Sequence, residues 1–251
     1  MYLGIDIGGT NTRIVTTQSL DDVVFESEVT IATNKQYITG EQEIIETIKE
    51  ITESVTAIGI GLPGSINNQG VLDGSTNLPD WVGKPLKAKL EEIFCCQVYV
   101  KNDAEIGALG ESHYGSCKAG DFLYLTWGTG LGVSQVKWQD GKPKVSRPNN
   151  RQSIYDLEEL VGGKNIEKRF SKEAQDLTEE EWILVVNDLY AELPSLAKEY
   201  GFSSFVIGGG IAVKKKDVLE NEALNVTDIE IDITDLDGKA GLYGALALCK
   251  D

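Results

Sequence analysis

The sequence is poor in metal-binding side chains. It contains a single histidine, His113, and four cysteines, none of which forms a Cys-x-x-Cys pair. A structural zinc site usually requires four cysteine or histidine ligands at paired spacing. The adjacent Cys95 and Cys96 are typical of core or strand-entry positions in a reducing compartment. The sequence therefore predicts no zinc site, and His113 is interpreted as a partly exposed helix residue.

Long apolar runs are also absent. No stretch approaches the ~20 consecutive apolar residues that a helix needs to span a bilayer. The opening residues 1–6 lack the positively charged region and the cleavage site of a signal peptide, and they are typical of a first strand. We therefore expect a cytoplasmic protein.

Basic residues are the minority among the charged ones. The 23 Lys and Arg residues stand against 40 Asp and Glu residues, which gives a formal net charge of −17. A field of that sign repels nucleic acid and anionic membranes, so neither is expected as a partner. A phosphate ligand is not excluded, because backbone amides bind phosphate locally whatever the net charge. The 251 residues suffice for one large domain or for two lobes with a real core.

Two similar strand–turn–strand patterns occur far apart in the chain. The first joins predicted strands 2–7 and 12–17 through Gly8-Gly9-Thr10-Asn11, and the second joins predicted strands 121–127 and 133–138 through residues 128–132. A repeated hairpin of this kind indicates two related lobes. Each turn can present backbone N–H groups to phosphate oxygens.

Hydrophobic periodicity predicts the remaining elements. Apolar residues at helical spacing predict amphipathic helices, and short apolar or alternating runs predict strands. The expected helices cover residues 41–53, 85–94, 104–114, 157–170, 179–200 and 239–248, the expected strands cover 23–31, 57–62, 97–101, 203–207 and 229–233, and residues 67–83 and 139–156 are expected to be loops. This order predicts an α/β protein with mixed sheets.

The two turns are candidate phosphate-binding sites. Asp6 stands at a strand end beside Gly8-Gly9-Thr10-Asn11, where it can hold Mg²⁺ through water while the turn amides and the Thr10 hydroxyl meet phosphates. Gly128-Thr129-Gly130 offers a second such turn, and the pair could clamp a triphosphate from two sides. Each turn alone is equally well explained as an ordinary hairpin that uses glycine for a positive φ.

Two further segments carry candidate acceptor-binding residues. Asn102-Asp103 follows a predicted strand, and phosphoryl transfer to an alcohol needs a carboxylate of this kind to accept and align the hydroxyl. Taken alone, helix capping explains Asp103 better. Asn77 can supply an amide fork for sugar hydroxyls. The alternative for its segment is a surface loop anchored by a buried Trp81.

Taken together, these segments resemble the motifs of the ROK family (repressor, open reading frame, kinase) of bacterial sugar kinases and sugar-responsive regulators. In chain order the matching segments are DIGGTNTR (6–13), GIGLPGSI (59–66), NLPDWVGKPL (77–86), VKNDAEIGALGE (100–111), WGTGLGV (127–133), LEELVGGKNI (157–166), VIGGGIA (206–212) and AGLYGALAL (240–248). The resemblance covers essentially the whole chain. Its specific part is NLPxWxGxPL followed by Asn-Asp, whereas the glycine turns alone are not specific.

The resemblance implies an actin-like ATPase (ribonuclease H-like) fold, in which two lobes, each with a mixed sheet flanked by helices, close over ATP and sugar. The expected N-terminal lobe covers residues 1–104, with the helix 239–251 packing back on it, and the expected C-terminal lobe covers residues 105–238. The implied activity is ATP-dependent phosphorylation of a hexose, glucose-like or an N-acyl hexosamine, at its primary hydroxyl, with Mg²⁺ and ATP as cofactors. The resemblance leaves a homodimer open.

Residue roles follow from the same resemblance. Asp103 is the implied general base, and Asp6 is the implied carboxylate that holds Mg²⁺ through water. The implied phosphate-binding residues are Gly8, Gly9, Thr10, Asn11, Thr129 and Gly130, the residues near the adenosine are Gly208, Gly209 and Gly210, and the sugar-contacting residues are Gly64, Asn77, Asn102 and Glu158.

The sequence departs from the family between Val133 and Leu157. Typical members carry a Glu-x-Gly-His element and a cysteine-rich zinc motif in this interval, whereas here it is short and contains neither histidine nor cysteine. Because Glu158 and the transfer residues remain, the chemistry is expected to survive with altered or relaxed sugar specificity. The residues of the shortened loop that are candidates to replace the lost contacts are Arg147, Asn149, Asn150 and Arg151.

Two other functions compete with a sugar kinase. One is a sugar or nucleotide sensor without efficient turnover, which the missing Glu-His pair supports and the retained Asp103 argues against. The regulator branch adds an N-terminal winged helix, whereas this chain opens at the first strand, so DNA binding is not expected. The other is an actin-fold kinase for a different alcohol such as pantothenate, which the segment NLPDW (77–81) fits poorly.

Overall fold

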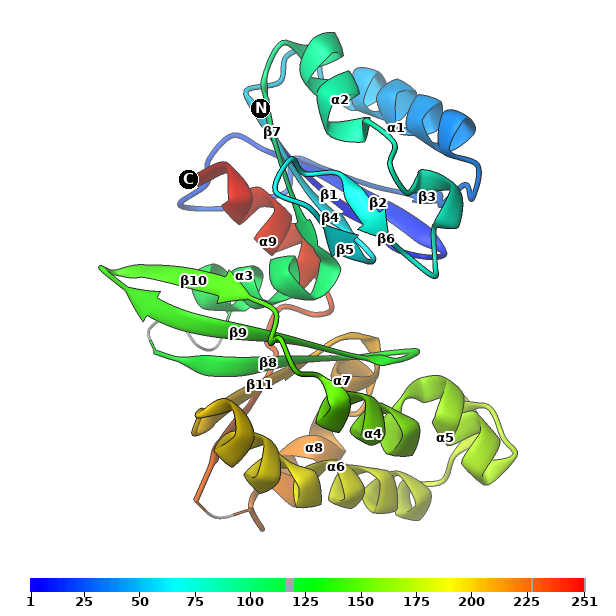
Figure 1. Ribbon diagram of the computed structural model, residues 1–251, viewed down its shortest axis with the longest axis vertical. Coiled ribbons are helices and arrows are strands. Elements are labelled where there is room, and N and C mark those ends of the chain that lie inside the picture. Colours follow the sequence, from blue (N-terminus) through cyan, green and yellow to red (C-terminus); the bar gives the residue numbers. More distant parts are fainter. Residues whose placement is uncertain (116–119, 227, 251) are drawn as a thin grey trace. The chain divides into compact units, whose positions relative to one another are not determined.

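The structure is a computed structural model that describes residues 1–115, 120–226 and 228–250. The chain forms two compact units (Figure 1): unit 1 contains residues 1–113 together with the C-terminal segment from Gly241, and unit 2 contains Tyr114–Ala240. The division comes later than the expected boundary at residue 104. The reason is that the helix α3 (Asp103–Tyr114) packs against the C-terminal helix of unit 1.

A mixed sheet forms the centre of unit 1. Its strands are β1 (Tyr2–Ile7), β2 (Asn11–Thr17), β3 (Ser27–Ala32), β4 (Ala57–Leu62) and β7 (Gln97–Asn102), in the order β3-β2-β1-β4-β7. The pairs β1–β2 and β2–β3 are antiparallel, while β4 and β7 run parallel to β1. The carboxyl ends of β1, β4 and β7 therefore meet at one edge of this sheet.

Helices cover both faces of this sheet (Figure 1). On one face, α1 (Tyr37–Ile51) and α2 (Leu86–Phe94) pack on the apolar side chains of alternate strand residues such as Leu3 and Ile5. On the other face lie α3 and the C-terminal helix α9 (Ala240–Ala247). A short hairpin of β5 (Ser65–Ile66) and β6 (Leu72–Gly74), the turn η1 (Pro79–Trp81) and the final turn η3 (Leu248–Lys250) complete the unit.

Glycines let the helices of the second face approach closely. A Cβ on Gly59 of β4 would lie 1.7 Å from the carbonyl oxygen of Ala245 in α9. A Cβ on Gly244 of α9 would lie 1.6 Å from the carbonyl oxygen of Ile106 in α3. Backbone therefore packs directly on backbone across the β4–α9–α3 layers, and no other residue fits these two positions without displacement.

Unit 2 repeats the sheet topology of unit 1. Its strands are β8 (Phe122–Trp127), β9 (Leu131–Gln139), β10 (Lys142–Ser146), β11 (Ser204–Gly208) and β12 (Glu230–Ile233), in the order β10-β9-β8-β11-β12. Here too the hairpin strands are antiparallel and the later strands run parallel to the first. The two related lobes that the repeated hairpin predicted are confirmed, as is the α/β class with mixed sheets.

The helices of unit 2 surround one large apolar core. They are α4 (Gln152–Val161), α5 (Gly163–Phe170), η2 (Ala174–Asp176), α6 (Glu179–Tyr200), α7 (Gly210–Lys214) and α8 (Lys216–Ala223). The indole rings of Trp127 and Trp182 meet edge-to-face at a centroid distance of 6.1 Å in this core. The start of α6 is fixed locally by a capping box, in which the side chains of Thr178 and Glu181 each accept a backbone N–H of the other residue.

Some predicted boundaries are wrong where a distant contact sets them. The third strand begins at Ser27 instead of Val23, and α1 begins at Tyr37 instead of residue 41. The carboxylate of Asp80 accepts the Tyr37 N–H at 2.8 Å, so a residue far along the chain caps this helix. None of the helices in the described part of the chain combines the length and the apolar character that crossing a bilayer demands.

The region 139–170 differs most from its prediction. The expected loop 139–156 contains β10, which pairs with β9 along its length, and the first residues of α4. The expected helix 157–170 is two helices, because Gly162 adopts an extended conformation (φ −61°, ψ 138°) between them. The short helices α7 and α8 were not predicted at all.

Thiol reactivity tests the packing of the C-terminal segment on unit 1. Cys95, Cys96 and Cys249 are free thiols, whereas Cys117 lies outside the described residues. Burial above all, and then the charge of Cys96, raises the pKa of Cys249 to about 12. A raised pKa lowers the thiolate fraction at pH values below it, so Cys249 is expected to react with iodoacetamide at least ~10-fold more slowly than the exposed Cys95.

Peptide mass spectrometry of the Cys117→Ser variant, labelled at mildly alkaline pH with and without urea, measures this difference. Urea should abolish it. Equal labelling of Cys95 and Cys249 in the native protein would show that the C-terminal segment is not packed on the sheet.

Candidate active site

The first part of the candidate site lies at the carboxyl end of β1. The guanidinium of Arg13 donates a hydrogen bond of 2.6 Å to Oδ2 of Asp6. Arg13 is the cross-strand partner of Asp6 in the β1–β2 pair, so the register of the hairpin brings the two side chains together. Gly241 of α9 lies against the same carboxylate, since a Cβ there would be 2.7 Å from Oδ2. Asp6 is thus held in place from two sides.

The turn Gly8–Asn11 follows Asp6 directly. It is closed by a hydrogen bond of 2.8 Å from the Gly8 N–H to the Asn11 carbonyl, and the Thr10 carbonyl accepts the Thr33 N–H at 2.8 Å. The ammonium of Lys35 donates to the Gly9 carbonyl. Because these carbonyls and the Gly8 N–H are engaged, the N–H groups of Gly9 and Thr10 are the ones that can meet an anion.

The loop that carries Asn77 lies beside this turn. A Cβ on Gly9 would be 3.4 Å from both Cβ and Cγ of Asn77. The loop is held by a hydrogen bond of 3.1 Å from the Leu78 N–H to Oγ of Ser75, and by the buried Trp81, whose indole N–H donates to the Asn34 carbonyl at 3.1 Å. The expected sugar-contacting residue and the expected phosphate turn are therefore adjacent in unit 1.

Tyr37 and Trp81 pack together and help to hold the Asn77 loop in place. Their rings meet edge-to-face at a centroid distance of 5.4 Å, and the Tyr37 hydroxyl donates to the carboxylate of Glu41. Burial above all, followed by the hydrogen bond and the charge of Glu41, raises the pKa of Tyr37 well above its usual value. Tyr37 therefore stays a neutral hydrogen-bond donor at any physiological pH.

The ends of β4 and β7 place Gly64, Asn102 and Asp103 at the same edge of the sheet. The Asn102 amide is buried and donates to the Gly64 carbonyl at 2.7 Å. The Ala104 N–H, in the first turn of α3, is accepted both by Oδ1 of Asn102 at 3.0 Å and by Oδ1 of Asp103 at 2.9 Å. Asp103 is exposed, and the helix N-terminus stabilises its negative charge.

Gly64 has a conformation that only glycine adopts easily. Its φ is +151°, and a Cβ would lie 2.1 Å from the Gly74 carbonyl oxygen. The glycine lets the segment after β4 turn sharply, so that its carbonyl reaches the amide of Asn102. A backbone carbonyl and a buried side-chain amide are thereby fixed next to Asp103.

In unit 2 the turn after β8 is bound to the start of α5. The carbonyls of Gly128 and Thr129 accept the N–H groups of Gly163 and Lys164, both at 3.0 Å. Because these two N–H groups belong to the first turn of α5, the helix orients the carbonyls of the turn toward itself. The amides of Thr129 and Gly130 are therefore left to meet an anion.

Glu158 is part of this arrangement. Its Oε2 accepts the Leu131 N–H at 2.9 Å, and a Cβ on Gly130 would lie 3.1 Å from the same oxygen. Its backbone carbonyl accepts the amide of Asn165 at 2.9 Å. The sequence predicted Glu158 as a sugar contact, and the structure places its carboxylate on the expected phosphate turn of unit 2.

The three glycines at the end of β11 differ in what they touch. A Cβ on Gly208 would be 2.5 Å from the Tyr124 hydroxyl, and a Cβ on Gly209, whose φ is +93°, would be 2.5 Å from the Trp127 carbonyl oxygen. Nothing lies within 4 Å of a Cβ on Gly210. Gly208 and Gly209 thus let the chain pass close to β8, next to the strand end that carries the turn 128–130.

Two polar residues of the shortened interval make contacts within unit 2. Asn150 donates to Glu199 at 3.1 Å, and its carbonyl accepts the Tyr200 hydroxyl at 3.0 Å. The guanidinium of Arg151 lies 5.4 Å from the centre of the Tyr155 ring. Asn150 and Arg151, two of the candidates to replace the lost sugar contacts, are thus engaged within unit 2.

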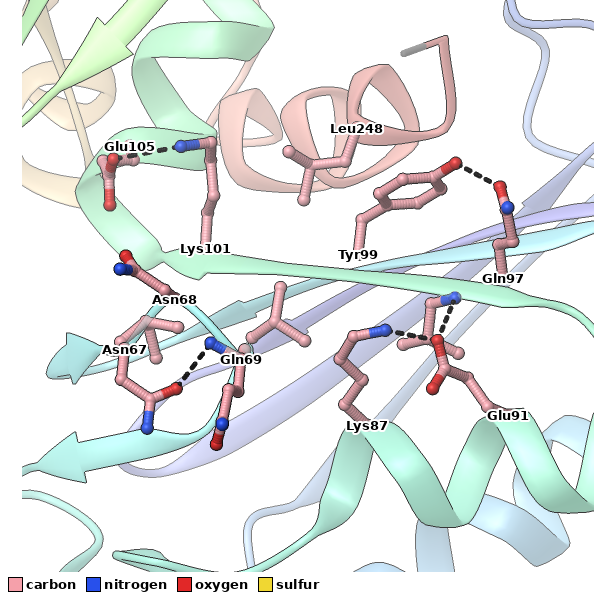
Figure 2. Close-up of a pocket in the computed structure, with 14 residues that line it drawn as sticks. Asn67, Asn68, Gln69, Lys87, Glu91, Gln97, Tyr99, Lys101, Glu105 and Leu248 are labelled. Carbon is pink, nitrogen blue, oxygen red and sulfur yellow. Dashed lines mark hydrogen bonds and ion pairs between the residues drawn. The ribbon is translucent and has the colours of Figure 1, made fainter.

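A separate cavity of about 590 Å³ lies along β7 in unit 1 (Figure 2). The turn 67–70 faces Lys87 and Glu91 of α2 across it, and Lys101 and Glu105 form an ion pair of 3.3 Å at one end. Its lysines are paired with carboxylates. Among the described residues that line it, none belongs to the predicted site.

Sequence reasoning missed two charged residues at the site, Arg13 and Lys35. Arg13 could have been found, because pairing the two strands around the turn 8–11 places it opposite Asp6. Lys35 carries no sequence signal, since its place depends on the path of the loop between β3 and α1.

Comparison with known proteins assigns the chain to a family. The model of the ROK family matches residues 2–144, more than half of the sequence. The chain belongs to the ROK family.

Among its relatives in the family, the glucokinase of Thermotoga maritima (strain ATCC 43589 / DSM 3109 / JCM 10099 / NBRC 100826 / MSB8) is 34% identical over 142 residues, which cover 53% of this chain and 44% of that protein. The xylose repressor of Caldicellulosiruptor bescii (strain ATCC BAA-1888 / DSM 6725 / KCTC 15123 / Z-1320) is 30% identical over 143 residues, 53% of this chain and 36% of the repressor. Each match thus spans less than half of the relative.

The solved structures extend the likeness to the whole chain. The ROK family glucokinase from Streptomyces griseus, solved in complex with glucose and AMPPNP, has a TM-score of 0.78 at 23% identity and covers 98% of both chains. This similarity establishes the fold. The protein has the actin-like ATPase fold of the ROK kinases, as the sequence motifs predicted.

Proposed function

We propose that this ROK protein transfers the terminal phosphoryl group of ATP to the primary hydroxyl of a hexose, either glucose-like or an N-acyl hexosamine. The observation that carries the proposal is the edge of the unit 1 sheet. The exposed carboxylate of Asp103, at the start of α3, lies at the edge where the carboxyl ends of β1, β4 and β7 meet. The turn 8–11 and the Asn77 loop lie at the same edge. A proton acceptor, a phosphate cradle and a polar sugar contact are what such a transfer requires.

In the proposed reaction, Asp103 accepts the proton of the hexose hydroxyl as that oxygen bonds to the γ-phosphorus. The bond from phosphorus to the bridging oxygen breaks, and ADP leaves with that oxygen. Since the transition state is loose, the protein contributes mainly alignment and charge stabilisation. The proposed sugar contacts are Gly64, Asn77 and Asn102. Glu158, the fourth residue that the sequence predicted there, is assigned to the turn 128–130 because its carboxylate accepts the Leu131 N–H.

The proposed nucleotide contacts lie in the glycine turns, with the N–H groups of Gly9, Thr10, Thr129 and Gly130 as the donors, because the Gly8 N–H closes its own turn. Gly8, Gly9, Thr10 and Asn11 in unit 1, and Thr129 and Gly130 in unit 2, are the proposed phosphate-binding residues, with Gly208, Gly209 and Gly210 near the adenosine. Supporting the proposal, each turn has carbonyls that are engaged elsewhere in its own unit. Amide cradles of this kind would allow a protein with a net charge of −17 to bind a polyanion.

The residues present fit a magnesium ion held mainly by the nucleotide. No cluster of three or more His, Cys, Asp or Glu side chains suited to a metal exists among the described residues. Mg²⁺ commonly binds through one carboxylate, waters and substrate phosphates, and Asp6 would supply that carboxylate. The ion would neutralise charge on the phosphates. Arg13 shares the Asp6 carboxylate and keeps it oriented at the turn.

The role of Glu158 gives a test within unit 2. Glu158→Ala removes the acceptor of the Leu131 N–H and loosens the turn, so the KM for ATP is expected to rise about tenfold, in line with the loss of one charge-assisted hydrogen bond. Glu158→Gln keeps an acceptor and should have a smaller effect. Steady-state kinetics with both substrates varied measure this, with the exposed Glu159→Ala as control. A rise in the sugar KM alone would show that Glu158 contacts the sugar and not the turn.

A sugar sensor is the second candidate function. The similarity to a xylose repressor and the short interval 134–156 favour it. A sensor binds a sugar without phosphorylating it, so the two functions differ in whether ADP is released in the presence of the sugar.

The deciding experiment is an ADP-release assay with Mg·ATP. The acceptors are glucose, mannose, fructose, N-acetylglucosamine, N-acetylmannosamine and pantothenate, with Asp103→Ala as control. Turnover on a hexose that Asp103→Ala abolishes supports the kinase. Binding of a hexose by calorimetry without any turnover supports the sensor, and turnover on pantothenate alone would contradict both.

A further inference from the structure

Lys35 lies where the phosphate turn meets the sugar loop. It stands in the loop 33–36 between β3 and α1, and its ammonium donates to two backbone carbonyls, that of Gly9 and, at 3.1 Å, that of Asn77. Gly9 belongs to the proposed phosphate turn, and Asn77 is a proposed sugar contact. One side chain therefore binds the backbone of both subsites.

Hydrogen bonds on two sides hold the loop that carries Lys35. The Thr33 N–H donates to the Thr10 carbonyl at 2.8 Å, and the hydroxyls of Thr12 and Thr33 are hydrogen-bonded at 2.9 Å. The Asn34 carbonyl accepts the Trp81 indole N–H at 3.1 Å. The base of the side chain is thus fixed to the turn on one side and to the segment after Asn77 on the other.

The contact with Gly9 fixes the orientation of a peptide group. The carbonyl of Gly9 and the N–H of Thr10 belong to the same planar trans peptide, so they point in opposite directions. When the ammonium holds the carbonyl, it also sets the direction of the Thr10 N–H. That N–H is one of the donors proposed to meet a phosphate oxygen, and a donor oriented in advance binds without the cost of reorganisation.

The same ammonium makes the two subsites depend on each other. Gly9 already packs on the Asn77 side chain, with a Cβ on Gly9 3.4 Å from it, so movement of one loop displaces the other. An ordered Asn77 loop holds Lys35 in place, and Lys35 then holds the turn. By thermodynamic linkage, order that a sugar imposes on one side strengthens phosphate binding on the other by the same factor in both directions.

We propose that Lys35 is a positioning residue that couples the phosphate turn to the sugar loop, so that hexose binding increases nucleotide affinity. The inference rests on the proposed function, since it assumes that a hexose and a nucleotide bind at these two loops. It adds a residue and a regulatory property, substrate synergism, to that function.

The test is calorimetry of AMPPNP with Mg²⁺, without and with a saturating concentration of the hexose selected by the ADP-release screen. In the native protein the hexose is expected to tighten AMPPNP at least ~5-fold, the lower end of typical coupling. In Lys35→Met the ratio should fall toward 1, by at least ~2-fold, because only the packing of Gly9 on Asn77 then links the loops, while both ligands still bind. Lys35→Arg, which keeps the charge and the donors, should retain most of the coupling. Lys49→Met, on an exposed part of α1, is the matched control.

The outcomes separate this inference from the proposed function. An unchanged ratio in Lys35→Met, or a ratio of 1 in the native protein, overturns the coupling role while the kinase stands. Absence of both AMPPNP and hexose binding in the native protein overturns the proposed function and the inference together. A fall in AMPPNP affinity of Lys35→Met that is equal with and without hexose would show that Lys35 supports the turn alone, which also overturns the coupling.

Discussion

Replacing Asp103 with asparagine is expected to lower kcat for hexose phosphorylation by about 10²- to 10⁴-fold, the usual contribution of a general base. An amide of the same shape cannot accept the proton of the hexose hydroxyl. The local structure should survive, because the Ala104 N–H is accepted by Asn102 at 3.0 Å as well as by Asp103, and an asparagine oxygen can replace the carboxylate there. The KM values should therefore change little.

The measurement is steady-state ADP release, together with a thermal unfolding curve for each protein. Asp73→Asn, at an exposed position of the short strand β6 in unit 1, controls for the loss of one negative charge. A kcat of Asp103→Asn within about threefold of the native value, accompanied by a lower melting temperature, would mean that Asp103 is only a helix cap, whose loss typically costs ~1 kcal/mol.

Replacing Gly244 with alanine is expected to destabilise unit 1 by more than ~3 kcal/mol, at or above the upper range for overpacking. In an ordinary helix this change stabilises by up to ~1 kcal/mol, so the predicted sign is the opposite of the local preference. The reason is tertiary: the new Cβ would lie 1.6 Å from the Ile106 carbonyl oxygen and 2.9 Å from the Gly110 nitrogen, both in α3. Backbone atoms cannot move aside as a flexible side chain does.

Urea unfolding followed by circular dichroism measures this change. Gly210→Ala in α7 is the matched control, because nothing lies within 4 Å of its Cβ, and it should be neutral or slightly stabilising. A stabilising Gly244→Ala would contradict the close packing of α9 on α3. Since α3 begins at Asp103, a strongly destabilised but folded Gly244→Ala protein should also lose activity, through displacement of the proposed base.

The sequence by itself determined the elements whose causes are local. The strand–turn–strand hairpins follow from apolar runs interrupted by glycine, and both were predicted at nearly their observed bounds. The helix 179–200 was predicted at its observed bounds from its apolar stripe, and the structure shows that the capping box that fixes its start is also local. The order of the motifs predicted the family and the fold, and the repeated hairpin predicted the second sheet.

Tertiary structure decided everything that depends on residues far apart in the chain. Asp80 sets the start of α1, the turn 128–130 sets the start of α5, and the packing of α9 on α3 sets the limit of unit 1. The same holds for the site. The carboxylate of Glu158 lies on the turn 128–130, and Lys35 lies at the junction of two loops, because folding brings together peptide groups that local preference leaves apart. Periodicity reports which face of an element is buried, and it carries no information on which distant backbone group that face will meet.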